Sequence, residues 1–503
     1  MMKHFLGVDL GTSAVKAALF NERGERVALA IEEYTLLTPG EDLCEVPARL
    51  FWDGFRSALA RALDESGVRA ESIVALAPSS QGETFVPVDA FGRPLRNAIS
   101  WLDNRSHAES DALEERFGRD LVYRTSGQPA VCPIWTATKI LWLRNNKPEI
   151  FGKAHKYLLA EDYLIHRLSG RFVSEYSVYS SSLLLDITRR AYWADMLDFL
   201  GISEDRLPEL VESGTAVGCL TQEAAEETGL SPKTLVVTGA YDHAAGSIGA
   251  GVTHAGVISE TTGSSMAICA PIDAPAFDPG YRVPCHCHAV PGKYFFSPYG
   301  ETAGMVMKWF RDRFCEPETA AAEASGKSAF EVMGELAAAV PAGSEGLLLL
   351  PFLSGTGSPE FNPRARGVYF GMTLKHTKGH FIRAVMESVA YMIARNIEVM
   401  EELGARVEEL RCLGGGAQSD LWCQIKADAL QRRVVVVEES EQALKGAAIL
   451  AGLGAGVFDD LESAGNRMVA IRKSYEPNAA TAEVYDKGCV TYGRLYNALE
   501  ALF

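Results

Sequence analysis

The stretch FLGVDLGTSAVKAALF, residues 5–20, decides the fold of this chain. Apolar residues fill positions 5–8, and after the glycine they alternate with other residues over positions 15–19. This pattern predicts a strand, a tight turn and a second strand, rather than a strand that feeds a helix. Residues 21–24, NERG, supply the next turn, so the chain is expected to begin as an antiparallel hairpin.

The turn of this hairpin carries the candidate chemistry. Asp9 ends the first apolar run, and Gly11, Thr12 and Ser13 follow it. A glycine lets the backbone approach a ligand, and successive N–H groups in a turn form a concave anion site, so the turn is predicted to bind phosphate. The alternative is an ordinary hairpin in which Asp9 and Thr12 serve only the turn.

Length and composition exclude several classes of protein. A chain of 503 residues is too long for one core, which favours two large domains. A hydrophobic fraction of 47% with 22% charged residues is ordinary for a globular enzyme, and no apolar run is long enough to cross a bilayer. A net charge of −17 without a basic block argues against binding to nucleic acid. Ten cysteines without regular spacing, and no export pattern at the N-terminus, predict a reduced, cytoplasmic chain.

A second strand and turn resemble the first. Residues 256–260 read as a strand that ends in Glu260 and runs into TTGS, as the first strand ends in Asp9 before its own turn. This echo predicts a duplicated architecture with one phosphate-binding turn in each half, although so short an echo could also be coincidence. Between the halves lies a run of small residues, GAYDHAAGSIGAG, at positions 239–251.

The order of elements indicates an α/β protein of two domains. Strand-like runs alternate with helical stretches in the first half, for example residues 73–77 with residues 50–63. We expect an N-terminal domain over residues 1–250 that binds sugar and phosphate, and a C-terminal domain over residues 251–503 that binds nucleotide.

A glycine-rich stretch in the second half is a candidate nucleotide site. Gly414, Gly415 and Gly416 follow a strand-like run and precede a helical pattern over residues 420–430. A strand, three glycines and a helix start can seat a nucleotide. The spacing does not match the dinucleotide fingerprint, and a tight strand-to-helix turn is the alternative.

Taken together, these features resemble the FGGY family of carbohydrate kinases, whose fold is shared with actin, hexokinase and the chaperone ATPase domain. The most specific match is GVYFGM at residues 367–372 and, after seven further residues, HFIRAVME at residues 380–387, which fits the C-terminal family signature. Residues 139–146, with Thr136 upstream, match the N-terminal signature, although Ile134 departs from it. The resemblance implies an actin/hexokinase-like ATPase fold of two duplicated ribonuclease-H-like domains with a cleft between them.

The resemblance also implies ATP and Mg²⁺ as cofactors. Asp9 is then implied to hold Mg²⁺, through water, since this ion prefers carboxylate and phosphate oxygens. The residues implied to bind the nucleotide are Gly11, Thr12, Ser13, Lys16, Thr261, Thr262, Gly263, Ser264, Gly414, Gly415, Gly416 and Gln418. For Lys16 an alternative stays open, because an alternating strand could equally direct it to solvent.

Asp242 matches the catalytic base of the family within GAYDHAAG. A sugar hydroxyl is a poor nucleophile, and a carboxylate within hydrogen-bond reach accepts its proton as the O–P bond forms. The alternative is a helix N-cap, for which an aspartate before a run of alanines is well suited.

The resemblance also implies which residues bind the sugar, because they align with the substrate segments of the family. These are Gln81, Glu83, Trp101, Asp103, Arg105 and His243. The loop SQGET at residues 80–84 aligns with Gln-Met-His-Gly of xylulokinases and Gln-Arg-Glu-Thr of glycerol kinases, and it fits neither completely. Glu83 stands at the polyol-contacting position of both. A surface salt bridge between Asp103 and Arg105 is the alternative for that pair.

The resulting expectation is ATP-dependent phosphorylation of a small sugar, with a ketopentose such as xylulose as the first candidate. A linear polyol or a deoxy-ketose (glycerol, erythritol or fuculose type) is the alternative, and an actin-like or chaperone-like ATPase is the rival from another class. The expected partners are the sugar and ATP, without nucleic acid or membrane, and a homodimer stays open. Residues 285–288, CHCH, carry metal-binding residue types, but consecutive side chains of a strand point to opposite faces, so a structural role is expected.

Overall fold

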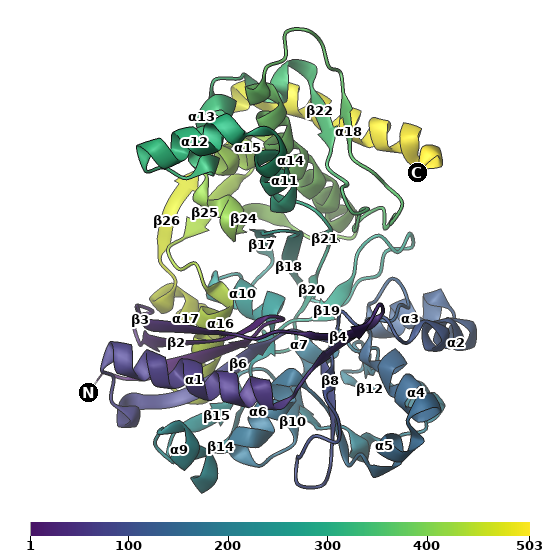
Figure 1. Ribbon diagram of the computed structural model, residues 1–503, viewed down its shortest axis with the longest axis vertical. Coiled ribbons are helices and arrows are strands. Elements are labelled where there is room, and N and C mark those ends of the chain that lie inside the picture. The colour runs from purple at the N-terminus through teal and green to yellow at the C-terminus, as the bar shows by residue number, and fades with distance from the viewer. Residues whose placement is uncertain (1) are drawn as a thin grey trace.

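The N-terminal stretch forms the predicted hairpin. The structure is a computed structural model that describes residues 2–503 (Figure 1), and in it β1 (His4–Leu10) pairs antiparallel with β2 (Ala14–Asn21), which pairs antiparallel with β3 (Arg26–Glu33). The turn between β2 and β3 needs Gly24, whose φ is +81° and whose missing Cβ would lie 2.1 Å from the Met468 carbonyl oxygen. The hairpin prediction is confirmed.

The first large sheet is built around β1. Its seven strands lie in the order β14 (Ala216–Cys219), β15 (Leu235–Val237), β6 (Ile73–Ser80), β1, β2 and β3, with β16 (Ala240–Tyr241) also paired to β6. β1 and β6 are parallel, and their register sets Asp9 beside Ser79, while the hairpin sets it beside Lys16.

The second large sheet repeats this arrangement above the first sheet in Figure 1, with β19 and β20 extending down toward the first half. Its eight strands lie in the order β19 (Cys285–Cys287), β20 (Tyr294–Phe296), β18 (Met266–Ile272), β17 (Gly256–Thr262), β24 (Val407–Leu413), β25 (Arg433–Val437) and β26 (Ile471–Tyr475), with β21 (Tyr299–Gly300) paired to β18. β17 forms an antiparallel hairpin with β18 and is parallel to β24, as β1 is to β2 and β6. The duplication predicted from the two turns is therefore present in the topology.

Four smaller sheets complete the β-structure. They are β4 (Leu37–Gly40), β5 (Leu43–Val46), β8 (Ala98–Ile99), β7 (Phe85–Val88) and β9 (Lys156–Leu159); β10 (Val173–Glu175) with β13 (Glu209–Val211); β11 (Leu185–Asp186) with β12 (Ala191–Tyr192); and β22 (Leu348–Leu350) with β23 (Val368–Phe370).

The helices surround the two sheets. Those of the first half are α1 (Arg49–Ser66), α2 (His107–Phe117), α3 (Arg119–Ser126), α4 (Thr136–Asn146), α5 (Pro148–Lys153), α6 (Ala160–Ser169), α7 (Tyr176–Tyr179), α8 (Ala194–Leu200), α9 (Gln222–Thr228) and α10 (Asp242–Gly249). Those of the second half are α11 (Gly304–Phe314), α12 (Glu316–Ser325), α13 (Ala329–Ala338), α14 (Lys378–Glu402), α15 (Asp420–Leu430), α16 (Gln442–Gly454), α17 (Leu461–Met468) and α18 (Ala482–Leu499). Across residues 2–503, none of these helices combines the length and apolar character needed to span a bilayer.

The run of small residues at the junction serves a close helix crossing. A Cβ on Gly446 of α16 would lie 1.8 Å from the Ala245 carbonyl oxygen of α10, and one on Gly249 would lie 1.9 Å from the Gln442 carbonyl oxygen. α16 also packs on β1 and β6, so this helix of the second half covers the first sheet, as Figure 1 shows. The domain boundary near residue 250 stays a prediction, since α16 and α17 lie beside the first sheet.

Candidate active site

Asp9 lies at the end of β1, partly exposed, where the hairpin turn begins. Its Oδ1 accepts a hydrogen bond of 3.2 Å from the Ser79 hydroxyl on the neighbouring strand. Burial raises the pKa of Asp9 to about 7, the charge of Asp242 adds to the rise, and the Lys16 ammonium opposes it. Asp9 and Asp242, which are far apart in sequence, are therefore close enough to repel each other.

Side-chain hydrogen bonds support the predicted phosphate turn, and two of its backbone N–H groups are free to bind a ligand. The Gly11 carbonyl oxygen accepts the Gln81 side-chain amide at 3.0 Å, and the Thr12 hydroxyl accepts the Trp101 indole N–H at 2.9 Å. The N–H groups of Thr12 and Ser13 make no hydrogen bond to any residue within 2–503, and Ser13 is exposed. Two residues predicted to contact sugar, Gln81 and Trp101, are therefore the supports of this turn.

Lys16 forms an ion pair between the first half of the chain and the second. Its ammonium lies 2.8 Å from the Glu441 carboxylate, just before α16, and both side chains are about a quarter exposed. This pairing replaces the solvent-facing alternative, and a contact between Lys16 and phosphate stays a prediction.

The second hairpin turn is fixed by a buried ion pair that the sequence did not reveal. Glu260 at the end of β17 and Lys426 of α15 are both fully buried, with Nζ and Oε2 2.5 Å apart. The Thr262 hydroxyl donates to Glu260 and accepts from Lys426 at 2.8 Å. The charge of Glu260 is thus balanced by Lys426, whereas its counterpart Asp9 is partly exposed near another carboxylate. The corresponding acids of the two hairpins therefore have different surroundings.

Replacing Lys426 by methionine is expected to lower the free energy of unfolding by about 3–5 kcal/mol, because it leaves the Glu260 carboxylate buried without a partner. Urea denaturation followed by circular dichroism measures this loss. The double variant Lys426→Met/Glu260→Gln removes the stranded charge and should recover most of the stability. A single variant as stable as the wild type would mean that the pair contributes nothing.

The glycine-rich stretch packs directly on this second turn. Gly414 has φ +73°, and a Cβ there would lie 2.8 Å from the Thr262 carbonyl oxygen. A Cβ on Gly416 would lie 2.6 Å from the Thr262 Cβ, whereas Gly415 is exposed. The predicted nucleotide residues of the second half therefore lie together, and only glycine permits that approach.

The other predicted nucleotide residues of the second half, Thr261, Gly263, Ser264 and Gln418, make different contacts. The carbonyl oxygens of Gly263 and Ser264 accept N–H groups at the start of α11, each at 2.9 Å, and Thr261 is half-buried. Gln418 is exposed, and its side-chain oxygen accepts a hydrogen bond of 2.9 Å from Arg472. No geometry here excludes these residues from a nucleotide site, and their roles stay predictions.

Asp242 is the first residue of α10, and its side chain is 41% exposed. Its Oδ1 accepts the His243 backbone N–H at 2.7 Å, while Oδ2 makes no hydrogen bond to any residue that the structure describes. The His243 ring lies beside it, with Nε2 3.8 Å from Oδ1. Asp242 is thus the first helical residue and not the N-cap, which is Tyr241 and makes no side-chain cap bond, so the N-cap alternative is wrong. One carboxylate oxygen bonds the adjacent N–H, and the other is open to a ligand.

The backbone that leads into α10 is held by buried carboxylates that sequence reasoning missed. Glu161 accepts the Gly239 N–H at 2.9 Å. Glu175 accepts the Ser177 hydroxyl at 2.8 Å, and the same hydroxyl oxygen accepts the Tyr241 N–H at 3.0 Å. Burial raises the pKa of both glutamates. These acids fix the segment before Asp242, and no motif in the sequence marks them.

Glu83 is buried near the same aspartate. Burial raises the pKa of its carboxyl, the Lys139 ammonium opposes the rise, and the charge of Asp242 adds to it. Beside Glu83, a Cβ on Gly82 would lie 2.3 Å from the Ser181 Oγ and 3.1 Å from the Tyr241 ring, so Gly82 leaves room for that ring. Glu83 and Asp242 are thus brought into one region.

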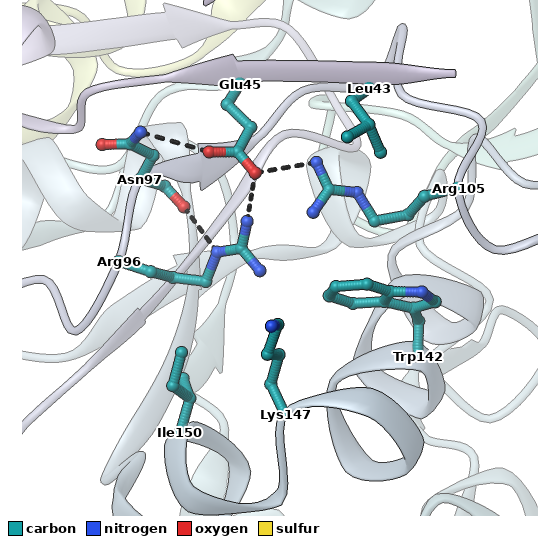
Figure 2. A pocket seen from close by; sticks show the side chains of 8 residues that line it. All are labelled: Leu43, Glu45, Arg96, Asn97, Arg105, Trp142, Lys147 and Ile150. Atoms are coloured by element: carbon teal, nitrogen blue, oxygen red, sulfur yellow. Dashed lines mark hydrogen bonds and ion pairs between the residues drawn. The ribbon is translucent and has the colours of Figure 1, made fainter. Parts of the chain in front are cut away.

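The predicted sugar residues Asp103 and Arg105 form a pair, and that pair is buried rather than on the surface. Arg105 Nε and Nη2 each lie 2.7 Å from an Asp103 oxygen, and the Cys44 N–H donates to Asp103 at 2.5 Å. The Asp103 side chain is fully buried and that of Arg105 is 5% exposed. Arg105 lines a separate pocket with Trp142 (Figure 2), so a sugar contact by this pair stays a prediction without support from the geometry.

The four consecutive metal-type side chains of residues 285–288 go to different neighbours. The His286 ring stacks on the Tyr241 ring at 5.8 Å between centroids, and His288 Nε2 lies 3.0 Å from the Ser247 hydroxyl. Within residues 2–503, no three His, Cys, Asp or Glu side chains are arranged to hold a metal ion.

Comparison with known proteins gives two adjacent matches that together cover most of the chain. The N-terminal domain of the FGGY family of carbohydrate kinases matches residues 4–249, and the C-terminal domain of that family matches residues 260–455.

Individual relatives match over nearly the whole length. The chain is 33% identical over 495 residues to a xylulose kinase of Bacillus subtilis (98% of this chain, 97% of the relative) and 30% identical over 501 residues to a gluconokinase of Bacillus licheniformis (99% and 97%). A ligand-bound xylulose kinase structure from Lactobacillus acidophilus superposes with a TM-score of 0.90 at 26% identity, covering 99% of both chains. The two-domain ATPase fold expected from the sequence is confirmed by this likeness.

Proposed function

Since this chain belongs to the FGGY family of carbohydrate kinases and is therefore an ATP-dependent sugar kinase, we propose that its substrate is a neutral ketopentose such as xylulose. The family membership argues against the rival of an actin-like or chaperone-like ATPase. The substrate is argued from the charges at the site, because the relatives include kinases of both a neutral ketose and a sugar acid.

The observation that carries the proposal is the concentration of carboxylates. Asp242 raises the pKa of both Asp9 and Glu83, so all three lie within electrostatic reach of one another. Lys139, the cation beside Glu83, is fully buried and donates to the carbonyl oxygens of Ser100 and Ile134 at 2.7 and 2.8 Å. A sugar acid would add a further negative charge to this group, whereas hydroxyl groups can donate hydrogen bonds to it.

Each residue then has a task in phosphoryl transfer. Asp242 accepts the proton of the attacking hydroxyl at its unbonded oxygen, and the free N–H groups of Thr12 and Ser13 hold phosphate oxygens. Asp9 suits Mg²⁺, because it is a hard oxygen ligand whose repulsion by Asp242 a cation would relieve. When bound, Mg²⁺ neutralises charge on the phosphate oxygens.

The test is a panel of neutral ketopentoses, deoxy-ketoses, linear polyols and gluconate in a coupled assay for ADP. A neutral ketopentose should give the highest kcat/KM, and gluconate should give none. A linear polyol or deoxy-ketose as the best substrate would favour the alternative that the loop of residues 80–84 leaves open. Gluconate as the best substrate would refute the charge argument.

Glu83→Ala should raise the KM for the sugar about 10- to 150-fold while leaving the KM for ATP nearly unchanged, because a hydrogen bond to a charged group contributes about 1.5–3 kcal/mol. Initial rates with each substrate varied in turn measure the two constants. Glu83→Gln, which keeps the size of the side chain, should show a smaller rise. Equal changes in both constants would indicate a loop that is only structural.

A further inference from the structure

A pocket of about 520 Å³ opens on the first half, among β5, α4 and α5. Figure 1 shows α4 and α5 at the end of this half that is farther from the second large sheet. Figure 2 shows the side chains that line it, which are Leu43, Glu45, Arg96, Asn97, Arg105, Trp142, Lys147 and Ile150. Of the candidate active-site residues only Arg105 is among them, and Asp9, Glu83 and Asp242 are not.

Three cations and one carboxylate meet in this pocket. Glu45 Oε1 accepts Nη2 of Arg96 and, at 2.8 Å, Nη2 of Arg105. Arg105 is satisfied further by Asp103 behind it. One carboxylate oxygen therefore serves two guanidinium groups, and the cations outnumber the acids even when Asp103 is counted.

Two cationic groups in the pocket keep N–H donors that no acid occupies. Arg96 uses Nε on the Asn97 carbonyl oxygen and Nη2 on Glu45, and its Nη1 makes no hydrogen bond to any of residues 2–503. Lys147 likewise has no partner in that part of the chain, and Figure 2 shows its ammonium directed into the same space as the Arg96 guanidinium. On a chain with a net charge of −17, the unbonded Nη1 of Arg96 and the unpaired Lys147 ammonium favour an anion at this place.

The remaining wall is apolar. The guanidinium carbons of Arg105 and Arg96 lie 4.8 and 5.7 Å from the centroid of the Trp142 ring, which fixes that ring at one side of the pocket. Ile150 and Leu43 line it as well. The pocket thus has a cationic end and a wall suited to carbon, and its volume lies in the range of about 300–1,000 Å³ found for small-molecule sites.

We propose that this pocket binds a small organic phosphate. The phosphate group lies between Arg96, just before β8, and Lys147, between α4 and α5, so that the two can bond separate oxygens of one phosphate. The carbon body lies against Trp142 and Ile150. The site is independent of the sugar proposed above, since neither Arg96 nor Lys147 belongs to the candidate active site.

Isothermal titration of the full chain with ribose 5-phosphate tests the proposal. Arg96→Gln and Lys147→Gln should each weaken binding at this site about tenfold or more, as expected for a lost charge-assisted hydrogen bond. Lys153→Gln is the matched control, because Lys153 is an exposed lysine at the end of α5, the helix that Lys147 precedes, and it lies outside the pocket lining. Kinase activity should be unchanged in all three variants, and thermal unfolding should be unchanged in Lys147→Gln and Lys153→Gln. Arg96→Gln also loses its ion pair with Glu45, so a lower unfolding temperature is expected for that variant and Lys147→Gln is the cleaner test.

Two further titrants separate the possible outcomes. Ribose without phosphate should not bind at this site, and inorganic phosphate should bind more weakly than ribose 5-phosphate. Equal binding of inorganic phosphate would refute an organic ligand. If wild type, Arg96→Gln and Lys147→Gln bind ribose 5-phosphate equally well, the ligand binds at another site. If Lys153→Gln loses as much affinity as the pocket variants, the binding is only general attraction to a cationic surface. Either result overturns the proposal.

Discussion

Asp9→Asn is expected to abolish turnover at ordinary Mg²⁺ concentrations while the fold stays intact. Asp9 ends β1 beside the open phosphate turn, and its carboxylate is the ligand that we assign to the cation. Asparagine keeps an oxygen for the Ser79 hydroxyl but has no charge with which to hold a divalent ion. The coupled assay for ADP over a series of Mg²⁺ concentrations measures the loss, and Asp111→Asn, which changes an exposed residue of α2, is the matched control.

The pH dependence of stability supplies a second, independent readout for Asp9. Its pKa in the folded protein is raised from 3.8 to about 7, so the folded state holds this proton to a higher pH than the unfolded state does. The wild type should therefore lose stability as pH rises through this window, relative to Asp9→Asn, which has no such proton to lose. Without ligand, the variant should unfold at an equal or higher temperature above pH 7. Wild-type turnover in Asp9→Asn would contradict the magnesium assignment, and a lower unfolding temperature of the variant above pH 7 would contradict the raised pKa of Asp9.

Local pattern was enough to predict the elements that position the site. The alternation of apolar residues identified β1 and β2 as a hairpin, and the helix predicted over residues 420–430 is α15 (Asp420–Leu430). These predictions succeed because the spacing of apolar side chains and the presence of turn residues determine structure over only a few positions. The duplicated hairpin was predicted for the same reason.

What the sequence could not show are contacts between distant segments. The sequence placed Glu260 beside a turn and Lys426 within a helical pattern, and nothing in either segment showed that they form a fully buried pair across 166 positions. Lys16 pairs with Glu441 of the second half. For Asp103 and Arg105 the sequence left a salt bridge open only as an alternative, on the surface, whereas the pair is buried. The sequence around a charged residue does not indicate its partner. Only the fold shows whether the charge is balanced by a neighbour, as that of Glu260 is, or is available to bind a ligand.

Asp242→Asn is expected to lower kcat by about 10²- to 10⁴-fold, the range typical for loss of a general base. Asparagine keeps the size of the side chain and an oxygen that can accept the His243 N–H, but it cannot take up the proton of a sugar hydroxyl. Steady-state rates with the best sugar of the panel measure this loss. Nucleotide affinity measured by calorimetry should change little, because the proposed phosphate donors lie on the two hairpin turns.

Comparison with Asp242→Ala separates the base from a carboxylate that only supports the start of α10. Alanine removes both the proton acceptor and the oxygen that bonds the His243 N–H, so it should lose activity as Asp242→Asn does and also lose about 0.5–1.5 kcal/mol of stability, the net contribution of one hydrogen bond. If the carboxylate served only the helix, Asp242→Asn would keep near-normal kcat and only the alanine variant would be impaired, through stability alone. The base would then have to be sought in Glu83 or His243, because both Asp103 oxygens are already filled by Arg105 and the Cys44 N–H.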